Sequence, residues 1–142
     1  MTVSLRLYRH PQDYPAVRAL WEGMEKGVNV GRSDSPEEIA KKAARDPDLF
    51  LLAEADGEIV GSIIGGFDGR RGMIYHLAVK REFRKQGIAA QLMDEVESRL
   101  RAKGCLKCYL LVMQSNDEAA HYYERRGWNE LKTVRLFGKE IS

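Results

Sequence analysis

The segment GMIYHLAVKREFRKQGIAAQLMDEVESRL (72–100) changes its hydrophobic pattern twice within a few residues. Residues 73–79 form an apolar run typical of a strand, and REFRKQG (81–87) is a short basic loop that contains a glycine. After the loop, apolar side chains recur at helical spacing, at Ile88, Leu92, Met93, Val96 and Leu100. The segment therefore predicts a strand, a loop with exposed backbone, and an amphipathic helix that stops at Gly104, where a glycine suits the C′ position.

The loop at 84–89 has the features of an anion-binding site. The first four N–H groups of a helix have no partner within the helix, and the helix dipole adds partial positive charge there. Gly87 has no side chain to keep a ligand from these groups, and the small side chain of Ala89 leaves space around the first helical turn. Arg84 and Lys85 add cationic charge, so we expect a pyrophosphate to bind here. The alternative is that Gly87 only permits a tight turn and that the basic residues are solvated.

The rest of the chain extends this unit on both sides. The element order read from the pattern is β-α-α-β-β-β-α-β-α-β. The strands are expected at 3–9, 49–55, 58–67, 73–79, 108–113 and 128–141, and the helices at about 12–25, from 36 to before 47, from 88 to before 104, and at 117–126. The sequence thus predicts a single α+β domain over residues 1–142, with a mixed sheet that is antiparallel over 49–79 and parallel around 73–113.

Composition excludes several classes of protein. The formal charge is +2, and the basic residues are interleaved with acidic ones, so no nucleic-acid partner is predicted. No apolar run approaches the ~20 residues of a membrane span, and the first residues lack a signal-peptide pattern. Cys105 and Cys108 are interpreted as structural cysteines of a reducing cytoplasm. The three histidines lack the spacing of metal ligands, so no metal site is predicted.

Two motifs together resemble the GNAT superfamily of acyl-CoA-dependent N-acetyltransferases. The first is R-x-x-G-x-A (84–89) between an apolar strand and an amphipathic helix, and the second is N-x-x-A-x-x-Y-Y-E-R-R-G-W (116–128). The match in element order covers essentially the whole chain. The segment GGFDGRRG (65–72) and the brevity of the chain after Gly127 look most like the bacterial YpeA-like branch.

The resemblance implies acetyl-CoA as a co-substrate and assigns residues to it. Strands 73–79 and 108–113 would splay apart and admit the thioester between them. Backbone groups of Leu77, Ala78 and Val79 would bind the pantetheine arm, and Asn116, besides capping its helix, would contact the same arm. The pyrophosphate would lie against Arg84, Lys85, Gln86, Gly87, Ile88 and Ala89.

The resemblance also places Tyr123 next to the thioester sulfur, where its phenol would protonate the leaving thiolate as a general acid. From the residues alone, either Tyr122 or Tyr123 is equally well a core aromatic. The general base that deprotonates the acceptor is open between Glu54, His76 and Glu82, and each of these also suits a purely structural role.

The function expected on this resemblance is transfer of an acetyl group to a primary amine, by a monomer or homodimer. The acceptor would be a small molecule or a peptide N-terminus, recognised by the loop at 27–35, the start of the second helix and the chain after Gly127. Two alternatives remain, a non-catalytic acyl-CoA-binding or sensing module and a small interaction domain with a basic loop. The pair of motifs disfavours the interaction domain, and Tyr123 favours catalysis over sensing.

Overall fold

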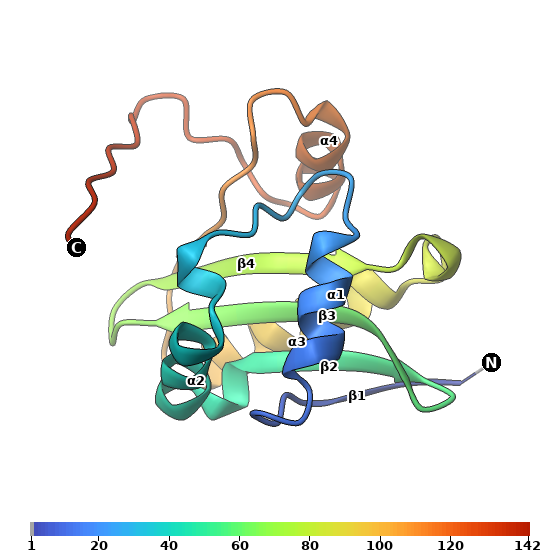
Figure 1. The fold of residues 1–142 in the computed structure, drawn as a ribbon. Coiled ribbons are helices and arrows are strands. Elements are labelled where there is room, and N and C mark those ends of the chain that lie inside the picture. The colour runs from blue at the N-terminus through green and yellow to red at the C-terminus, as the bar shows by residue number, and fades with distance from the viewer. Residues whose placement is uncertain (1) are drawn as a thin grey trace. The chain divides into compact units, whose positions relative to one another are not determined.

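The computed structural model describes residues 2–142, which form two compact units. The first unit extends to Leu111 and the second comprises Val112–Ser142. Figure 1 shows the helices and strands of each unit. No helix among the described residues is long and apolar enough to cross a membrane.

The first unit is built on one five-stranded sheet in the order β1-β2-β3-β4-β5. Its strands are β1 (Val3–Leu7), β2 (Phe50–Ala55), β3 (Glu58–Phe67), β4 (Gly72–Val79) and β5 (Cys108–Tyr109). All neighbours are antiparallel except β4 and β5, which are parallel, so the predicted mixed, mostly antiparallel sheet is confirmed. The β2–β3 turn follows from Asp56-Gly57, whose φ angles of 51° and 79° are the left-handed values that a tight hairpin requires.

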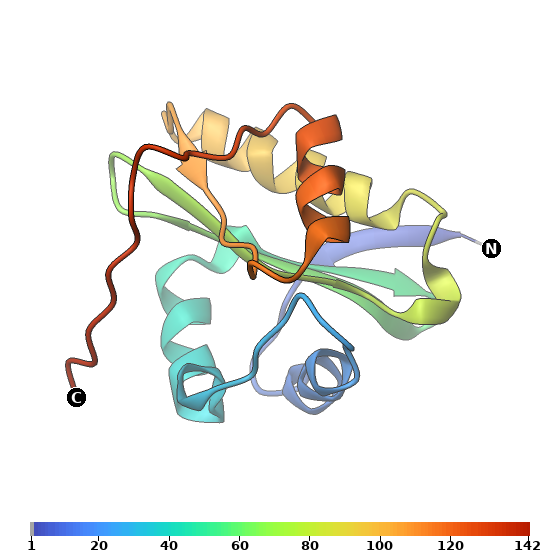
Figure 2. The same cartoon turned by 90° about the horizontal axis from the view of Figure 1, so that it is seen from above.

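Helices cover both faces of this sheet (Figure 2). On one face lie α1 (Tyr14–Glu22) and α2 (Pro36–Arg45), and on the other lies α3 (Ile88–Ala102). Ser35 caps α2 by accepting a hydrogen bond from the Glu38 N–H at 3.2 Å. The first helix is shorter than the predicted 12–25. The Asp13 carboxylate just before it is held by the Arg6 guanidinium and the Arg9 N–H.

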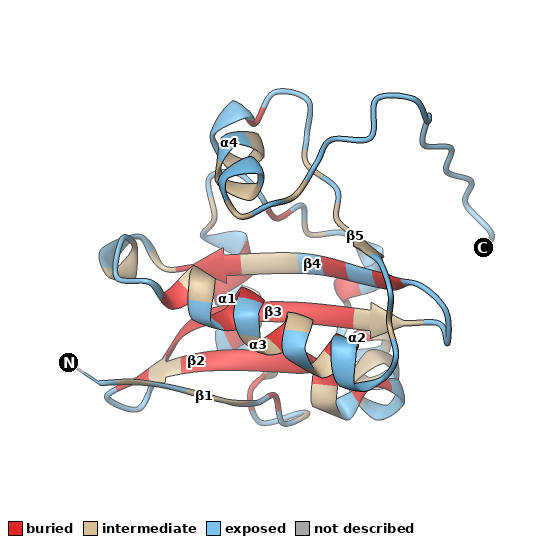
Figure 3. Ribbon diagram, turned by 180° about the vertical axis from the view of Figure 1, so that it is seen from behind, coloured by how far each residue is buried: buried red, intermediate tan, exposed pale blue. Residues whose placement is uncertain are grey.

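The core lies on both sides of β2 and β3, which are buried along most of their length (Figure 3). On the α1 face, Phe50 stacks on Tyr8 and on Trp21, with ring centroids 4.1 Å and 6.2 Å apart. On the opposite face, α3 buries the five apolar side chains that its sequence period predicts. The helix carries the basic loop at its start, so this packing holds the loop against the end of β4.

The predicted strand at 108–113 is wrong in extent. Only Cys108 and Tyr109 pair with β4, opposite Gly72 and Met73, and Leu111 is 63% exposed. The apolar run therefore does not mark a strand covered on both faces. Beyond Met73, the β4 edge that faces β5 has no paired strand among the described residues.

The second unit contains α4 (Asp117–Arg125), which begins as predicted with Asn116 as its cap. The Asn116 side chain accepts a hydrogen bond from the Ala119 N–H at 3.1 Å. The strand predicted at 128–141 is absent. Its residues form neither helix nor strand and are largely exposed, with Phe137 at 85% and Ile141 at 88%. An alternating pattern becomes a strand only where a neighbouring edge accepts its backbone hydrogen bonds, and no such pairing is present here.

Candidate active site

The basic loop between β4 and α3 presents exposed backbone. A short 3₁₀ turn (Arg81–Phe83) follows the strand, and then Lys85 and Gly87 adopt left-handed φ angles of 62° and 82°. No described side chain caps α3, whereas α2 and α4 both have side-chain caps. A Cβ added at Gly87 would meet no atom within 4 Å. The space beside Gly87 is therefore open, and the first N–H groups of α3 have no side-chain cap among the described residues, which suits an anionic ligand.

Arg84 has a more specific position than the sequence suggests. Its Nε donates to the Val79 carbonyl oxygen at 3.0 Å, and its Nη1 lies 3.2 Å from the Glu25 carboxylate. These contacts hold the loop against the end of β4 and partly neutralise Arg84. Lys85 and Gln86 are exposed, and Lys85 pairs with no carboxylate in the described part of the chain. Lys85 is consequently the cation of this loop that is available to a ligand.

The strand before the loop contains a β-bulge that the sequence did not reveal. Ser62 of β3 lies opposite Ala78 and Ile64 lies opposite Tyr75, so His76 and Leu77 together face one β3 residue. His76 has a left-handed φ of 54°. Such a bulge bends the strand and changes the direction of the following side chains. Leu77, Ala78 and Val79 follow directly, and no strand in the described part of the chain pairs with their edge on the β5 side.

The three candidate bases lie in very different surroundings, and His76 is the one that is largely buried against a carboxylate. Its Nε2 lies 2.8 Å from Asp34 Oδ1, with 14% and 6% of the two side chains exposed. Asp34 belongs to a 3₁₀ turn (Arg32–Asp34) between α1 and α2. Sequence reasoning missed Asp34, because nothing local connects two residues 42 positions apart.

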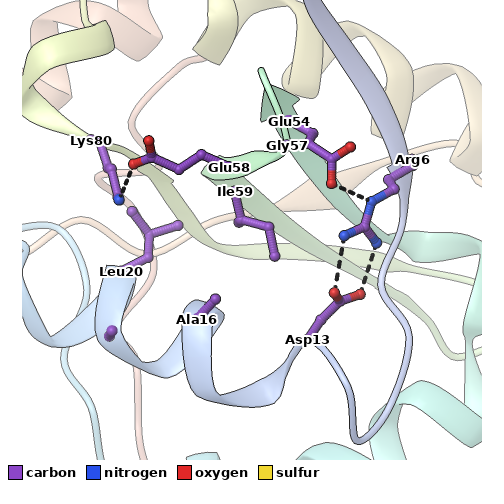
Figure 4. Close-up of a pocket in the computed structure, with 10 residues that line it drawn as sticks. Arg6, Asp13, Ala16, Leu20, Glu54, Gly57, Glu58, Ile59 and Lys80 are labelled. Atoms are coloured by element: carbon purple, nitrogen blue, oxygen red, sulfur yellow. Dashed lines mark hydrogen bonds and ion pairs between the residues drawn. The ribbon is translucent and has the colours of Figure 1, made fainter.

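Glu54 belongs to a different pocket, of about 540 Å³, between α1 and the strands (Figure 4). Arg6 donates to Glu54 Oε2 at 3.0 Å and to both oxygens of Asp13. The hydrogen bond to Asp13 is the main cause that raises the pKa of Arg6, and Arg6 in turn lowers the pKa of Asp13. Lys80 pairs with Glu58 at the same pocket. Glu54 is thus one partner in a set of paired charges.

Glu82 is exposed in the 3₁₀ turn after β4, and it makes no hydrogen bond or ion pair with the described residues. A solvated carboxylate of this kind has nothing that holds it toward a substrate. Of the three predicted candidates, His76 is paired with a carboxylate, Glu54 is paired with a guanidinium, and Glu82 is exposed.

In the second unit, Tyr123 lies within α4 and makes edge-to-face contacts with Tyr122 and Trp128. Burial raises the pKa of Tyr123 to about 12. The phenol is therefore protonated at neutral pH, the state that a proton donor needs. Asn116 is buried at the start of the same helix.

A second groove, of about 380 Å³, runs between α2 and the β3–β4 hairpin. Tyr75 and Met73 of β4 line it, together with Lys42 of α2 and Tyr109 of β5. Burial raises the pKa of Tyr75 to about 12. The groove is therefore lined along β4 by the residues that immediately precede His76.

Comparison with known proteins agrees with the motifs and the fold. The profile of the acetyltransferase (GNAT) family matches residues 14–128. An acetyltransferase of Pectobacterium atrosepticum is 40% identical over 139 residues, which are 98% of this chain and 96% of the relative. An acetyltransferase of Photorhabdus laumondii is 42% identical over 123 residues, 87% of this chain and 84% of the relative.

Solved structures share the architecture. Ard1 of Thermoplasma volcanium has a TM-score of 0.77 at 25% identity, covering 89% of this chain and 82% of that one. The PaiA N-acetyltransferase of Thermoplasma acidophilum, solved in complex with coenzyme A, has a TM-score of 0.74 at 22% identity and covers 89% of each chain. A family profile over 14–128 and relatives at 40% identity across nearly their whole length show that this chain belongs to the GNAT family of acetyltransferases.

Proposed function

We propose that this protein transfers the acetyl group of acetyl-CoA to a primary amine by direct attack in a ternary complex. The observation that carries this proposal is the uncapped N-terminus of α3, which follows the unpaired edge of β4 through a loop with left-handed Lys85 and Gly87. A helix N-terminus with open N–H groups and a nearby cation suits a pyrophosphate. An unpaired strand edge suits an extended chain that carries amide groups, as pantetheine does.

In this proposal the coenzyme lies along the end of β4 and the start of α3. The pyrophosphate binds the N–H groups at the start of α3, with Arg84, Lys85, Gln86, Gly87, Ile88 and Ala89 around it. The pantetheine amides bind backbone groups of Leu77, Ala78 and Val79, and Asn116 supports the same arm. We further propose that both units act as one acetyltransferase domain, since the family profile includes residues of each.

In this reaction the acceptor nitrogen loses two protons and the sulfur gains one. The acceptor ammonium first loses a proton to a base, and the amine lone pair then attacks the thioester carbonyl carbon. When the C–S bond breaks, the sulfur leaves with the bonding electrons as a thiolate, and the nitrogen loses a second proton. Tyr123 donates a proton to the thiolate and regains one from the nitrogen, a general-acid contribution of ~10²–10⁴-fold. The net products are an amide, coenzyme A and one proton.

We propose that the acceptor approaches on the face that α1 and α2 cover. His76 contacts the edge of Trp21 on that face, and the groove lined by Tyr75 and Met73 lies beside α2. The acceptor is either a small amine or a peptide N-terminus, because both present a primary amine on a flexible chain. The alternative function, a non-catalytic acyl-CoA sensor, needs the loop at α3 but has no use for Tyr123.

The test measures binding and turnover separately. Calorimetry with acetyl-CoA measures binding, and release of coenzyme A is then followed with a panel of amines, polyamines, amino acids and peptides. We expect binding and release with at least one class of amine. Binding without release on any member of the panel would support the sensor instead, and no binding would refute both functions.

Tyr123→Phe tests the proton donor. It keeps the ring but deletes the hydroxyl, so we expect kcat to fall ~10²–10⁴-fold while acetyl-CoA affinity changes little. Tyr122→Phe is the matched control, because successive residues point about 100° apart around a helix. Full turnover by Tyr123→Phe together with lost turnover by Tyr122→Phe would show that the proton donor is Tyr122 and that the motif is misaligned by one residue.

A further inference from the structure

Resting on the proposed function, we propose that His76 is the group that deprotonates the acceptor ammonium, and that Asp34 is its positioning residue. Asp34 fixes the imidazole in the tautomer that carries its proton on Nε2, which leaves Nδ1 free to accept a proton. The two residues come from elements far apart in the chain, the bulge in β4 and the turn between α1 and α2.

The Asp34 carboxylate is held on both oxygens. Oδ1 lies 2.8 Å from His76 Nε2, and Oδ2 accepts the Gly31 N–H at 2.9 Å. The Asp34 main-chain oxygen accepts hydrogen bonds from the Tyr14 hydroxyl at 2.6 Å and from Arg18 Nη1 at 3.1 Å. With 6% of its side chain exposed, Asp34 has little freedom to turn away from the imidazole.

The His76 backbone and ring are held as firmly from the other side. The Ser62 hydroxyl donates to the His76 carbonyl oxygen at 3.0 Å, and it accepts a hydrogen bond from Trp21 Nε1 at 2.9 Å. The Trp21 ring meets the imidazole edge-on, with centroids 4.6 Å apart and an interplanar angle of 67°. The left-handed φ of 54° at His76 is unusual for a residue with a side chain, and it persists only where the surroundings impose it.

The chemistry of the pair follows from donor and acceptor roles. A carboxylate only accepts hydrogen bonds, so the nitrogen that faces Asp34 carries a proton. In the neutral ring the other nitrogen is then an acceptor, and Nδ1 has no partner among the described residues. When Nδ1 takes a proton from the ammonium, the amine lone pair becomes free to attack. The resulting imidazolium is stabilised by the Asp34 charge and later releases its proton to solvent.

The location of the pair agrees with this role. His76 immediately precedes Leu77, Ala78 and Val79, the strand edge proposed to bind pantetheine. Tyr75 and Asp34 are titratable groups in direct contact with the imidazole. Arg18 contacts Asp34 through the main-chain oxygen, and its other partners are Tyr14 and Glu22. The Glu54 carboxylate is occupied by the Arg6 guanidinium, a cation that disfavours proton uptake, and Glu82 is exposed, so neither is placed as favourably to accept a proton.

The first test reads the tautomer directly and does not depend on activity. In ¹⁵N NMR spectra of the wild-type protein at mildly alkaline pH, we expect the His76 proton on Nε2. Asp34→Asn introduces an amide that donates to Nε2, so we expect the proton to move to Nδ1. Asp13→Asn replaces another buried carboxylate, one that pairs with Arg6, and should leave the His76 signals unchanged. A wild-type proton on Nδ1 would overturn the proposal, even if Asp34→Asn fails to fold.

The second test separates a base from a structural residue by changing the acceptor. An alkylamine is protonated at neutral pH and needs a base, whereas a hydrazide is already neutral and does not. We expect His76→Gln and Asp34→Asn to lower kcat with the alkylamine about 10²-fold or more. With the hydrazide the same variants should retain most of the wild-type turnover. The alkylamine is taken from the members of the amine panel that release coenzyme A, and the hydrazide is its matched analogue. An equal loss with both acceptors would refute the assignment of His76. Absence of coenzyme A release across the whole panel would instead count against the proposed function and leave the NMR result intact.

Discussion

The two ends of α3 offer a controlled test of the pyrophosphate site. Gly87 precedes the helix with φ of 82°, and Gly104 follows it with φ of 88°. A Cβ at either position would meet nothing within 4 Å. The left-handed conformation costs a residue with a side chain about 1–2 kcal/mol, and loss of glycine flexibility in the unfolded chain offsets about 0.4–1 kcal/mol of that. Alanine at either site should therefore lower the free energy of unfolding by about 1 kcal/mol.

Ligand binding should distinguish the two glycines sharply. Glu in place of Gly87 adds bulk and negative charge where the phosphates would bind. One like charge about 4 Å away costs ~1 kcal/mol in water and ~4 kcal/mol at an effective dielectric constant of ~20. These energies correspond to about 5-fold to 1,000-fold weaker acetyl-CoA binding per phosphate charge. Gly104→Glu, at the opposite end of the same helix, should bind acetyl-CoA like the wild type.

The assay is calorimetry with acetyl-CoA on each folded variant, with thermal unfolding as the check on folding. S-acetylpantetheine, which lacks the pyrophosphate, is a second control, and its binding should not distinguish Gly87→Glu from the wild type. A folded Gly87→Glu protein with unchanged acetyl-CoA affinity would refute the assignment of the pyrophosphate to α3. An equal loss in Gly104→Glu would show that charge on the helix acts nonspecifically.

Three further predictions concern residues on and beside the sheet. Burial raises the pKa of Cys108 to about 11, so the thiol should be alkylated slowly at neutral pH. As the pH is raised toward 11, the alkylation rate should increase about tenfold per pH unit. Cys105→Ser and Cys108→Ser should both retain acetyltransferase activity, and an oxidant-dependent loss that either variant prevents would contradict this structural role. A Cβ at Gly65 would lie 2.7 Å from Val96 Cγ2 on α3, so Gly65→Ala should lower the free energy of unfolding by about 1–3 kcal/mol in urea denaturation. A Cβ at Gly66 would meet only the flexible end of the Lys42 side chain, at 3.3 Å, so Gly66→Ala should lower the free energy of unfolding by less. Equal losses in the two variants would show that α3 shifts to accommodate the added methyl group at Gly65.

Much of the first unit was predictable because its signals are local. Asp56-Gly57 determines a hairpin, Ser35 caps a helix, and Gly87 and Gly104 bound α3, each through backbone geometry over a few residues. The apolar period of α3 likewise identified the five residues that it buries. The two motifs indicated the family, which the relatives confirm.

Patterns that need a distant partner were less reliable. The alternation at 128–141 and the apolar run at 108–113 both resemble strands, yet only Cys108 and Tyr109 are paired. A strand is stabilised by hydrogen bonds to another strand, and sequence alternation does not reveal whether that edge is available. The same limit hid the bulge at His76, which exists only relative to the register of β3.

By itself, the sequence determined the strand–loop–helix unit of 73–102, its exposed N–H groups and the family to which the chain belongs. The tertiary structure alone determined which partner each candidate base has. It brings Asp34 to His76 across 42 residues, and it engages Glu54 with Arg6. Helix starts and tight turns follow from the conformational limits of a few successive residues. The pairing of a buried carboxylate with an imidazole depends instead on how the α1–α2 segment packs across the sheet.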